Sequence, residues 1–129
     1  MVVKARRRVA PPRNRDGLLV SNAIRKIAEF WSLTNEGLGQ VLGLSDSTVS
    51  RLRSGGWQFR PGTKSFELAQ YLMRLFRSLD SMMGSDDAAA RSWLASHNAD
   101  LGGKPIDLIH TIRGLSDVAD YVDDYRARV

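Results

Sequence analysis

Residues 34–55, TNEGLGQVLGLSDSTVSRLRSG, carry the signals of two short helices joined by a tight turn. Thr34 can cap the first helix. Apolar residues then recur on one face of that helix at i, i+3 and i+4 spacing: Leu38, Val41 and Leu42. Gly43 permits a sharp turn because glycine tolerates a positive φ, and Ser45 or Asp46 can cap the second helix. The stretch predicts a helix-turn-helix in an all-α protein.

The second of these helices is predicted to bury Val49 and Leu52 and to expose a polar side. That side carries hydroxyl and guanidinium groups, with no acid after the start of the helix: Ser47, Thr48, Ser50, Arg51 and Arg53. Such groups reach base edges and phosphates, so we interpret this as a DNA recognition helix. Arg60, just beyond it, is expected to touch a phosphate. The alternative is an ordinary pair of surface helices, but such pairs seldom carry this residue set along their whole exposed side.

A basic segment and a further helix precede the motif. Residues 1–15 carry a charge of +6 with no acid and contain two prolines, so we predict an arm that is disordered when free. The arm either grasps DNA or keeps the terminus soluble. Residues 17–33 show a helical apolar stripe that is expected to pack over the motif: Leu19, Val20, Ala23, Ile24, Ile27, Phe30 and Trp31. Arg25, Lys26 and Glu29 are assigned to the wet side.

A connector and a long helix follow the motif. In GGWQFRPG, residues 55–62, the two aromatic residues are expected to cover the end of the core. Thr63–Met83 reads as a long amphipathic helix with apolar residues on more than one face. That breadth fits either a central core helix or a seam at a domain junction or dimer. One short recognition helix reads too few base pairs for a promoter, so we expect a homodimer that uses this helix, the C-terminal region, or both.

The last third of the chain contains RSWLASHNADLGGKPIDLIHTIRG at residues 91–114. We interpret it as a helix end, a glycine turn, a short helix with Pro105 in its first turn, and a stop at Gly114. Asp86 and Asp87 begin the helix before it, since acids are favourable in a first turn. By itself, the pattern suits a small helical subdomain with no partner equally well.

The order of these residues resembles the toxin-binding domain of Xre/MbcA/ParS-type antitoxins. Several positions match together: Trp93, Leu94, Asn98, Leu101, Gly102, Pro105, Leu108, Ile109, Thr111 and Gly114. With the helix-turn-helix upstream, the chain resembles an Xre-type antitoxin. The resemblance implies that it neutralises a RES-domain toxin, which consumes NAD, and represses the operon by binding double-stranded promoter DNA. It also implies no catalytic activity and no cofactor, and most matched residues are expected to build the domain rather than touch the toxin.

The final helix is predicted to span Leu115–Arg128. Its apolar face is expected to pack on Trp93 and Leu108–Ile109: Leu115, Val118, Ala119 and Val122. In the family that the chain resembles, this helix and the tail lie against the entrance to the toxin's active site. The predicted toxin-binding residues are therefore those off the apolar face: Tyr121, Asp124, Tyr125, Arg126, Arg128 and Val129. Alternatively, the two arginines simply complement the C-terminal end of the helix.

Charge and composition limit the possible functions. The 129 residues are divided here into the arm (1–15), a helix-turn-helix domain (16–62), a connecting helix (63–84) and a toxin-binding domain (85–129). Charge changes from +6 in the arm to +2 over residues 16–84 and −3 over residues 85–129, so the basic end suits DNA and the acidic end suits a protein. There is no cysteine and no apolar run long enough for a membrane span or a signal peptide, so we expect a cytoplasmic protein.

Enzymatic candidates are weak. His97 and His110 are thirteen positions apart with no metal-ligand spacing around them. Asp123 and Asp124 are adjacent and diverge on a helix, so they are expected to form a solvated face. We predict a binding protein rather than an enzyme, with no metal. The alternative function is a free-standing dimeric transcriptional regulator with no toxin partner, and a neighbouring gene for a RES-domain protein would distinguish the two.

Overall fold

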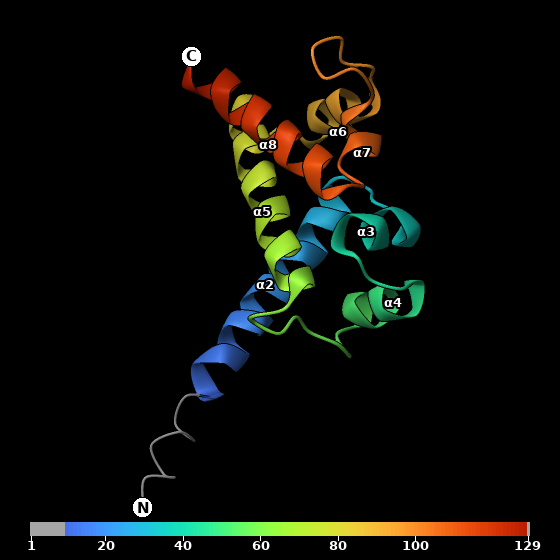
Figure 1. Cartoon of the computed structure of the whole chain (residues 1–129), viewed down its shortest axis with the longest axis vertical. Coiled ribbons are helices and arrows are strands. Elements are labelled where there is room, and N and C mark those ends of the chain that lie inside the picture. Colours follow the sequence, from blue (N-terminus) through green and yellow to red (C-terminus); the bar gives the residue numbers. More distant parts are fainter. Residues whose placement is uncertain (1–9, 129) are drawn as a thin grey trace, which may run out of the picture.

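The computed structural model describes the backbone of residues 10–128 and the side chains of residues 15–128. Within this range the chain forms seven helices and no strand, which confirms the all-α prediction (Figure 1). The helices are α2 (Ala10–Phe30), α3 (Asn35–Leu42), α4 (Asp46–Ser54), α5 (Lys64–Met82), α6 (Asp87–Ala95), α7 (Pro105–Leu108) and α8 (Ile112–Ala127). An isolated backbone bridge between Asn98 and Gly103 closes the glycine turn between α6 and α7.

The first helix begins earlier than the sequence predicted. Residues 10–15 were assigned to a disordered arm, but α2 begins at Ala10. Pro11 and Pro12 occupy the first turn of the helix, where the missing N–H groups would have no intrahelical acceptor in any case. The rest of the proposed arm, residues 1–9, lies outside the described residues, so its grasp of DNA stays a prediction.

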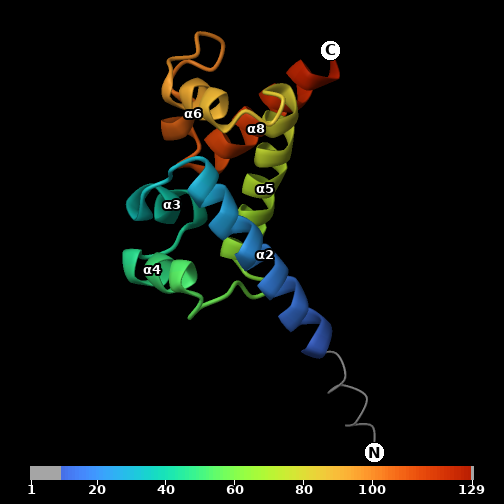
Figure 2. The ribbon, with the colours of Figure 1, turned by 180° about the vertical axis from the view of Figure 1, so that it is seen from behind.

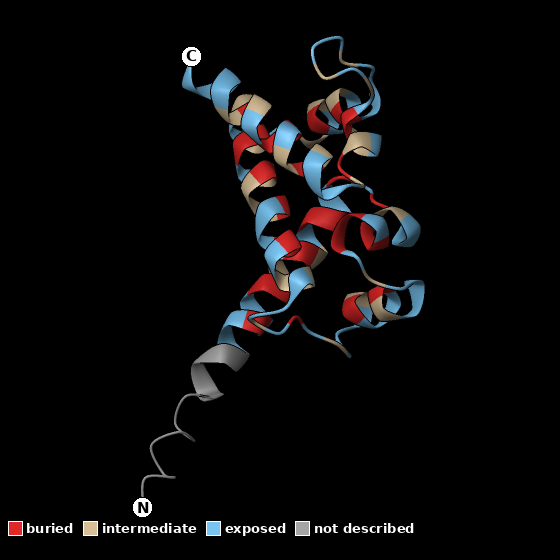
Figure 3. Ribbon diagram, viewed as in Figure 1, coloured by how far each residue is buried: buried red, intermediate tan, exposed pale blue. Residues whose placement is uncertain are grey.

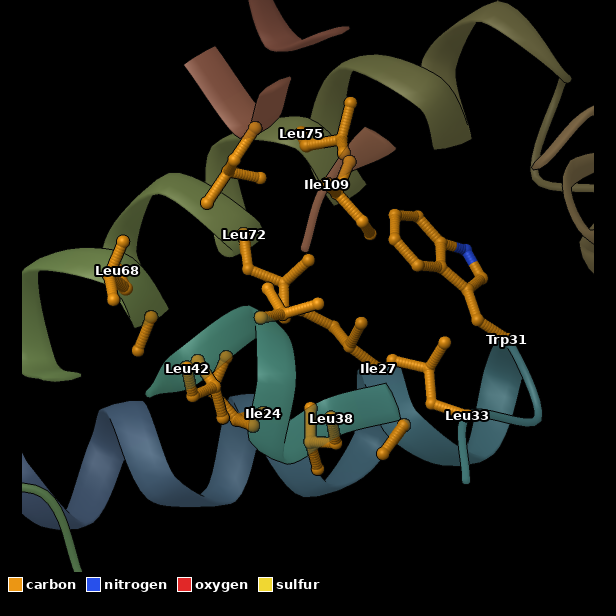
Figure 4. Close-up of a cluster of buried hydrophobic side chains, with 14 of the residues drawn as sticks. Ile24, Ile27, Trp31, Leu33, Leu38, Leu42, Leu68, Leu72, Leu75 and Ile109 are labelled. Carbon is orange, nitrogen blue, oxygen red and sulfur yellow. The ribbon is translucent and has the colours of Figure 1, made fainter. Parts of the chain in front are cut away.

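α5 is the central helix of the molecule, with α2, α3 and α8 packed around it (Figures 1 and 2). Figure 4 shows where its buried side meets α2, α3 and Ile109, which follows α7: Ile24, Ile27, Leu38, Leu42, Leu68, Leu72, Leu75 and Ile109. The core is a single cluster that spans both predicted domains. Each fully buried Leu or Ile contributes about 1.5–3 kcal/mol relative to an exposed one, so the two halves stabilise one another.

Side-chain caps begin most of the helices, and the sequence predicted those at Thr34 and Ser45. The capping residues are Thr34, Ser45, Thr63, Asp86 and Thr111. In each case a side-chain oxygen accepts a hydrogen bond from the backbone N–H three residues on, which satisfies a group that has no partner inside the helix. Ser45, and not Asp46, caps α4. The turn before it is made by Gly43 at φ 69°, as predicted.

Gly114 does not end the short helix α7, contrary to the prediction. It lies in the first turn of α8, where its N–H donates to the Thr111 side chain at 3.0 Å. The backbone passes so close to α7 that a Cβ on Gly114 would stand 1.8 Å from the Leu108 carbonyl oxygen. The glycine is therefore required by a contact between two helices rather than by a helix stop, and α8 begins at Ile112 rather than Leu115.

Figure 3 shows that the helices turn their buried residues towards one another and their exposed residues outwards. No helix among residues 10–128 is both long enough and apolar enough to cross a membrane.

Candidate functional site

α4 is the best-defined candidate binding element, because its body-facing side and its outer side differ sharply. Val49 and Leu52 are fully buried, as predicted. The helix lies at the edge of the molecule, on the other side of α2 from α5 (Figures 1 and 2). Ser47, Ser50 and Arg51 are exposed on it. A short exposed helix that carries hydroxyl and guanidinium groups has the composition of a DNA-reading surface.

Four of the five predicted DNA-binding residues on α4 make hydrogen bonds inside the protein, and two of these four are half-buried. The exposed Ser47 hydroxyl lies 3.2 Å from the Ser45 hydroxyl, and the exposed Arg51 donates to the Thr48 hydroxyl at 3.4 Å. Thr48 is half-buried, and its hydroxyl accepts a hydrogen bond from the capping Ser45 hydroxyl at 2.9 Å. Arg53 is also half-buried, and its Nη1 donates to the Leu33 carbonyl at 3.2 Å. Arg53 therefore fixes α4 against the chain that follows α2, in addition to any contact with phosphate.

Arg25 helps to hold α4 in place, a role that the sequence did not predict. It was assigned to the wet side of α2, yet its Nη1 donates to the Leu52 carbonyl at 3.0 Å. That carbonyl lies in the last turn of α4, where such groups lack intrahelical donors and a cation is favourable. A helical pattern gives no signal of this contact, because it depends on where α4 comes to rest against α2.

The connector after α4 follows the prediction. Phe59 is 1% exposed, and its N–H donates to the buried Ser21 hydroxyl at 2.9 Å. The Trp57 ring meets the Phe59 ring edge-on, with 5.1 Å between centroids. The aromatic residues therefore cover the end of the core. Arg60 is exposed next to them, where it can meet a phosphate.

α8 is fixed to α5 by charged groups as well as by apolar contact. The apolar face predicted for α8 is buried, but it lies chiefly along α5 rather than on Trp93 and Leu108–Ile109. α5 offers a long apolar side, whereas α7 has only four residues. Arg74 of α5 binds Asp123 through Nη2 at 2.6 Å and Nε at 2.9 Å, and binds Asp120 at 2.9 Å.

The sequence had suggested that Asp123 belongs to a solvated face. The structure shows that it does not, because its carboxylate is bound to Arg74. Burial alone would raise the pKa of its carboxyl. The Ser78 hydroxyl and the Arg74 guanidinium donate hydrogen bonds to it, and with the nearby charges they hold the pKa below its ordinary value. The same hydrogen bond to Asp123, and then that to Asp120, raise the pKa of Arg74. Asp124, the neighbour, is exposed as predicted.

An aromatic surface lies where the ends of α5 and α8 meet α6, and consists of Met82, Met83, Trp93, Tyr121 and Tyr125. Tyr121 stacks on Trp93 with 6.4 Å between centroids, and Tyr125 packs on Tyr121 at 6.4 Å. The Tyr121 hydroxyl donates to Asp100 at 3.0 Å. The five residues line a hollow of about 380 Å³. A second hollow of about 200 Å³ adjoins it and is lined by Asp100, Tyr121, Asp124, Tyr125 and Arg128.

Two regions of the chain match protein families. Residues 10–74 match the antitoxin Xre-like helix-turn-helix domain. Residues 78–128 match the antitoxin Xre/MbcA/ParS C-terminal toxin-binding domain. The chain belongs to the Xre-type antitoxin family. A comparison with curated proteins found no match.

The antitoxin carries α4 inside the first match and all of the aromatic surface inside the second. Of the predicted toxin-binding residues, Tyr121, Asp124, Tyr125 and Arg128 surround one hollow. Arg126 is exposed but lines neither hollow, and Val129 lies outside the described residues. Sequence reasoning missed Asp100 and the two methionines, because only the folded chain brings them beside α8. The roles of all these residues, and of those on α4, stay predictions.

The antitoxin also has a hollow of about 500 Å³ at the junction of its two halves. It lies between the start of α3 and the α6–α7 region, and contains none of the predicted site residues. Arg91 lines it and donates to the Phe30 carbonyl at 2.7 Å, which ties α6 to the end of α2. Among the residues that the structure describes, no three of His, Asp and Glu gather as metal ligands would.

Proposed function

We propose that this antitoxin neutralises a RES-domain, NAD-consuming toxin by binding it through the aromatic surface and the exposed end of α8. It also represses its own operon by binding promoter DNA through α4, as a homodimer. Since its partners are promoter DNA and a toxin made in the same cell, it acts in the cytoplasm. Both roles are binding roles, with no catalysis and no cofactor.

The exposure of Tyr125 carries the toxin-binding part of the proposal. Its side chain is 51% exposed and stands between the two hollows, in the region that matches a toxin-binding domain. Tyrosine and arginine supply much of the binding energy at many protein interfaces, and Arg128 lies beside the ring. Asp100 and Asp124 border the same hollow, so the toxin surface that fits here is apolar with basic groups at its margin.

The exposed side of α4 carries the DNA-binding part. Ser47, Ser50 and Arg51 point away from the body and have no acid beside them after the first turn of the helix. α4 also lies well away from the ends of α5 and α8 that carry the aromatic surface, so the antitoxin can hold the toxin and DNA at the same time (Figure 1). Three exposed side chains read only a few base pairs, which is why two copies are needed for a promoter.

The toxin test uses a matched pair of tyrosine substitutions. Tyr125→Ala is expected to weaken binding to the toxin encoded by the neighbouring gene by about 2 kcal/mol, or roughly 30-fold. Tyr71→Ala removes an exposed tyrosine from α5, outside the aromatic surface, and is expected to bind normally. Titration calorimetry with the purified toxin measures both. Equal affinities for the two variants would contradict this surface as the toxin site.

Deletion of residues 125–129 provides the test in cells. The truncated antitoxin is expected to bind promoter DNA as before, while cells that express the toxin lose protection. If it protects as well as the full chain, the toxin is held elsewhere. If no neighbouring protein copurifies while the promoter is still bound, the chain acts instead as a free-standing regulator.

A further inference from the structure

An apolar face lies where α2 and α5 meet. On α2, Leu19, Ala23 and Phe30 follow i, i+4 and i+11 spacing, which places them on one side of the helix. On α5, Phe66, Met73 and Phe76 follow i, i+7 and i+10 spacing and likewise share a side. We name these six residues the α2–α5 face.

Phe76 joins the two helices into one face. Its ring stacks on Phe30 with 5.8 Å between centroids and packs on Trp31 at 5.4 Å. Leu19 is 60% exposed and Phe30 is 40% exposed, although both are large and apolar. The three α5 residues of the face are half-buried. Exposed apolar groups that gather in this way mark an interaction site rather than a random surface.

We infer that a second copy of this chain docks on the α2–α5 face. The inference names the surface of the homodimer in the proposed function and rests on that function. It also adds α2 to the regions that the sequence had offered for a dimer.

Charge at the margin of the face favours a second copy over other partners. Lys26 and Glu29 lie on α2, and Arg77 and Asp80 lie on α5, so both signs are present on both helices. A two-fold interface brings the same patch of each copy together, so it needs a surface that is complementary to itself. A patch that carries both positive and negative charges meets that need, whereas a polyanion such as DNA would favour a patch of basic residues.

The position of the face also suits a repressor. α4 lies on the other side of α2 from α5 in both views, and the aromatic surface lies at the far ends of α5 and α8 (Figures 1 and 2). Docking through the α2–α5 face therefore leaves both recognition helices and both candidate toxin sites uncovered.

A second exposed apolar residue serves as the control. Ile112 is 63% exposed and lies with Tyr71 on the opposite flank of α5, beside a hollow of about 380 Å³. Leu19 and Ile112 are similarly exposed, at 60% and 63%, and both are aliphatic, so neither L19D nor I112D should disturb the core. A charge at Leu19 would be buried without a partner in the proposed dimer, and a charge at Ile112 would stay in water.

Sedimentation equilibrium of the full chain tests the inference. Concentrations of about 1 to 100 µM cover the range in which dimers with a micromolar Kd dissociate. Wild type and I112D are expected to sediment as dimers, and L19D as one chain of 14.4 kDa, with its dimer Kd raised at least about tenfold. A dimeric L19D would overturn the inference. A monomeric I112D or a monomeric wild type would overturn it equally. Toxin binding by L19D is measured as well. It is expected to be retained, because loss of the dimer leaves the aromatic surface intact, so failure of the dimer proposal can be distinguished from failure of the proposed toxin binding.

Discussion

The two halves of this antitoxin present their candidate residues in different ways. On α4, one side is buried and the other carries Ser47, Ser50 and Arg51 into solvent. On α8, Tyr121 is stacked on Trp93 and Asp123 is bound to Arg74. A short helix that touches the body on one side follows its helical pattern, apart from Thr48 and Arg53, which are half-buried. A long helix that has neighbours on several sides uses some of its polar residues to hold itself in place.

The starts of α3 and α8 make the same point on a smaller scale. Each has a capping threonine with a glycine three residues later, and each glycine N–H donates to the threonine hydroxyl: Thr34 with Gly37, and Thr111 with Gly114. A Cβ on Gly37 would meet only the Thr34 hydroxyl, at 3.1 Å. A Cβ on Gly114 would collide with the backbone of α7. Identical local patterns thus hide different tertiary requirements.

The largest expected effect separates these two helix starts. Gly114→Ala is expected to lower the free energy of unfolding by about 3 kcal/mol, since the backbone of α7 must move to admit the methyl group. Gly37→Ala, the matched control, is expected to change it by less than about 1 kcal/mol, because a hydroxyl can shift and alanine favours a helix. Urea denaturation of both variants measures the difference. Equal losses would mean that the two starts are under the same constraint.

The next effect separates two arginines within α4. Arg51→Ala is expected to weaken promoter binding by roughly 1–3 kcal/mol if Arg51 reads a guanine, with no change in Tm. Arg53→Ala is expected to lower Tm as well, because Arg53 donates to the Leu33 carbonyl. Gel-shift titration and thermal melting of both variants provide the test. A drop in Tm for R51A would show that this side of α4 is not reserved for DNA.

The smallest effect concerns Asp123 and its neighbour. At pH 7, Asp123→Asn is expected to cost about 1 kcal/mol of stability, since the charged bond to Arg74 is lost at a partly exposed site. A lowered pKa means that the wild-type advantage is present above the ordinary aspartate pKa near about 3.9, and is lost as pH falls through the lowered value. Asp124→Asn, at an exposed position, is expected to have no effect. Urea midpoints measured at a series of pH values from neutral downwards decide: an advantage that does not shrink as pH falls below about 3.9 would contradict the assigned cause.

Local signals account for what the sequence predicted correctly. The caps at Thr34 and Ser45 need only nearby backbone, and the burial of Val49 and Leu52 follows from spacing alone. These features therefore fix the helices and the helix-turn-helix.

The features that escaped prediction depend on distant parts of the chain. Arg25 finds the Leu52 carbonyl, and Asp123 finds Arg74, 49 positions away. Asp100 joins the aromatic surface through Tyr121. No periodicity in the sequence records which helix a polar side chain will meet. The sequence could therefore place the candidate toxin site on α8, but it could not predict which residues from other parts of the chain line the site.

The position of α5 limits how antitoxins of this family can exchange their DNA-binding and toxin-binding domains. The two family matches end and begin inside this one helix, on either side of residues 75–77, and the helix packs on both halves. Inserting one residue there would rotate everything downstream by about 100° and advance it by about 1.5 Å. A chimera that joins this DNA-binding half to another toxin-binding half must therefore keep the residue count of α5. It must also retain a carboxylate on the last helix to receive Arg74, so recombination between relatives is confined to crossovers in register.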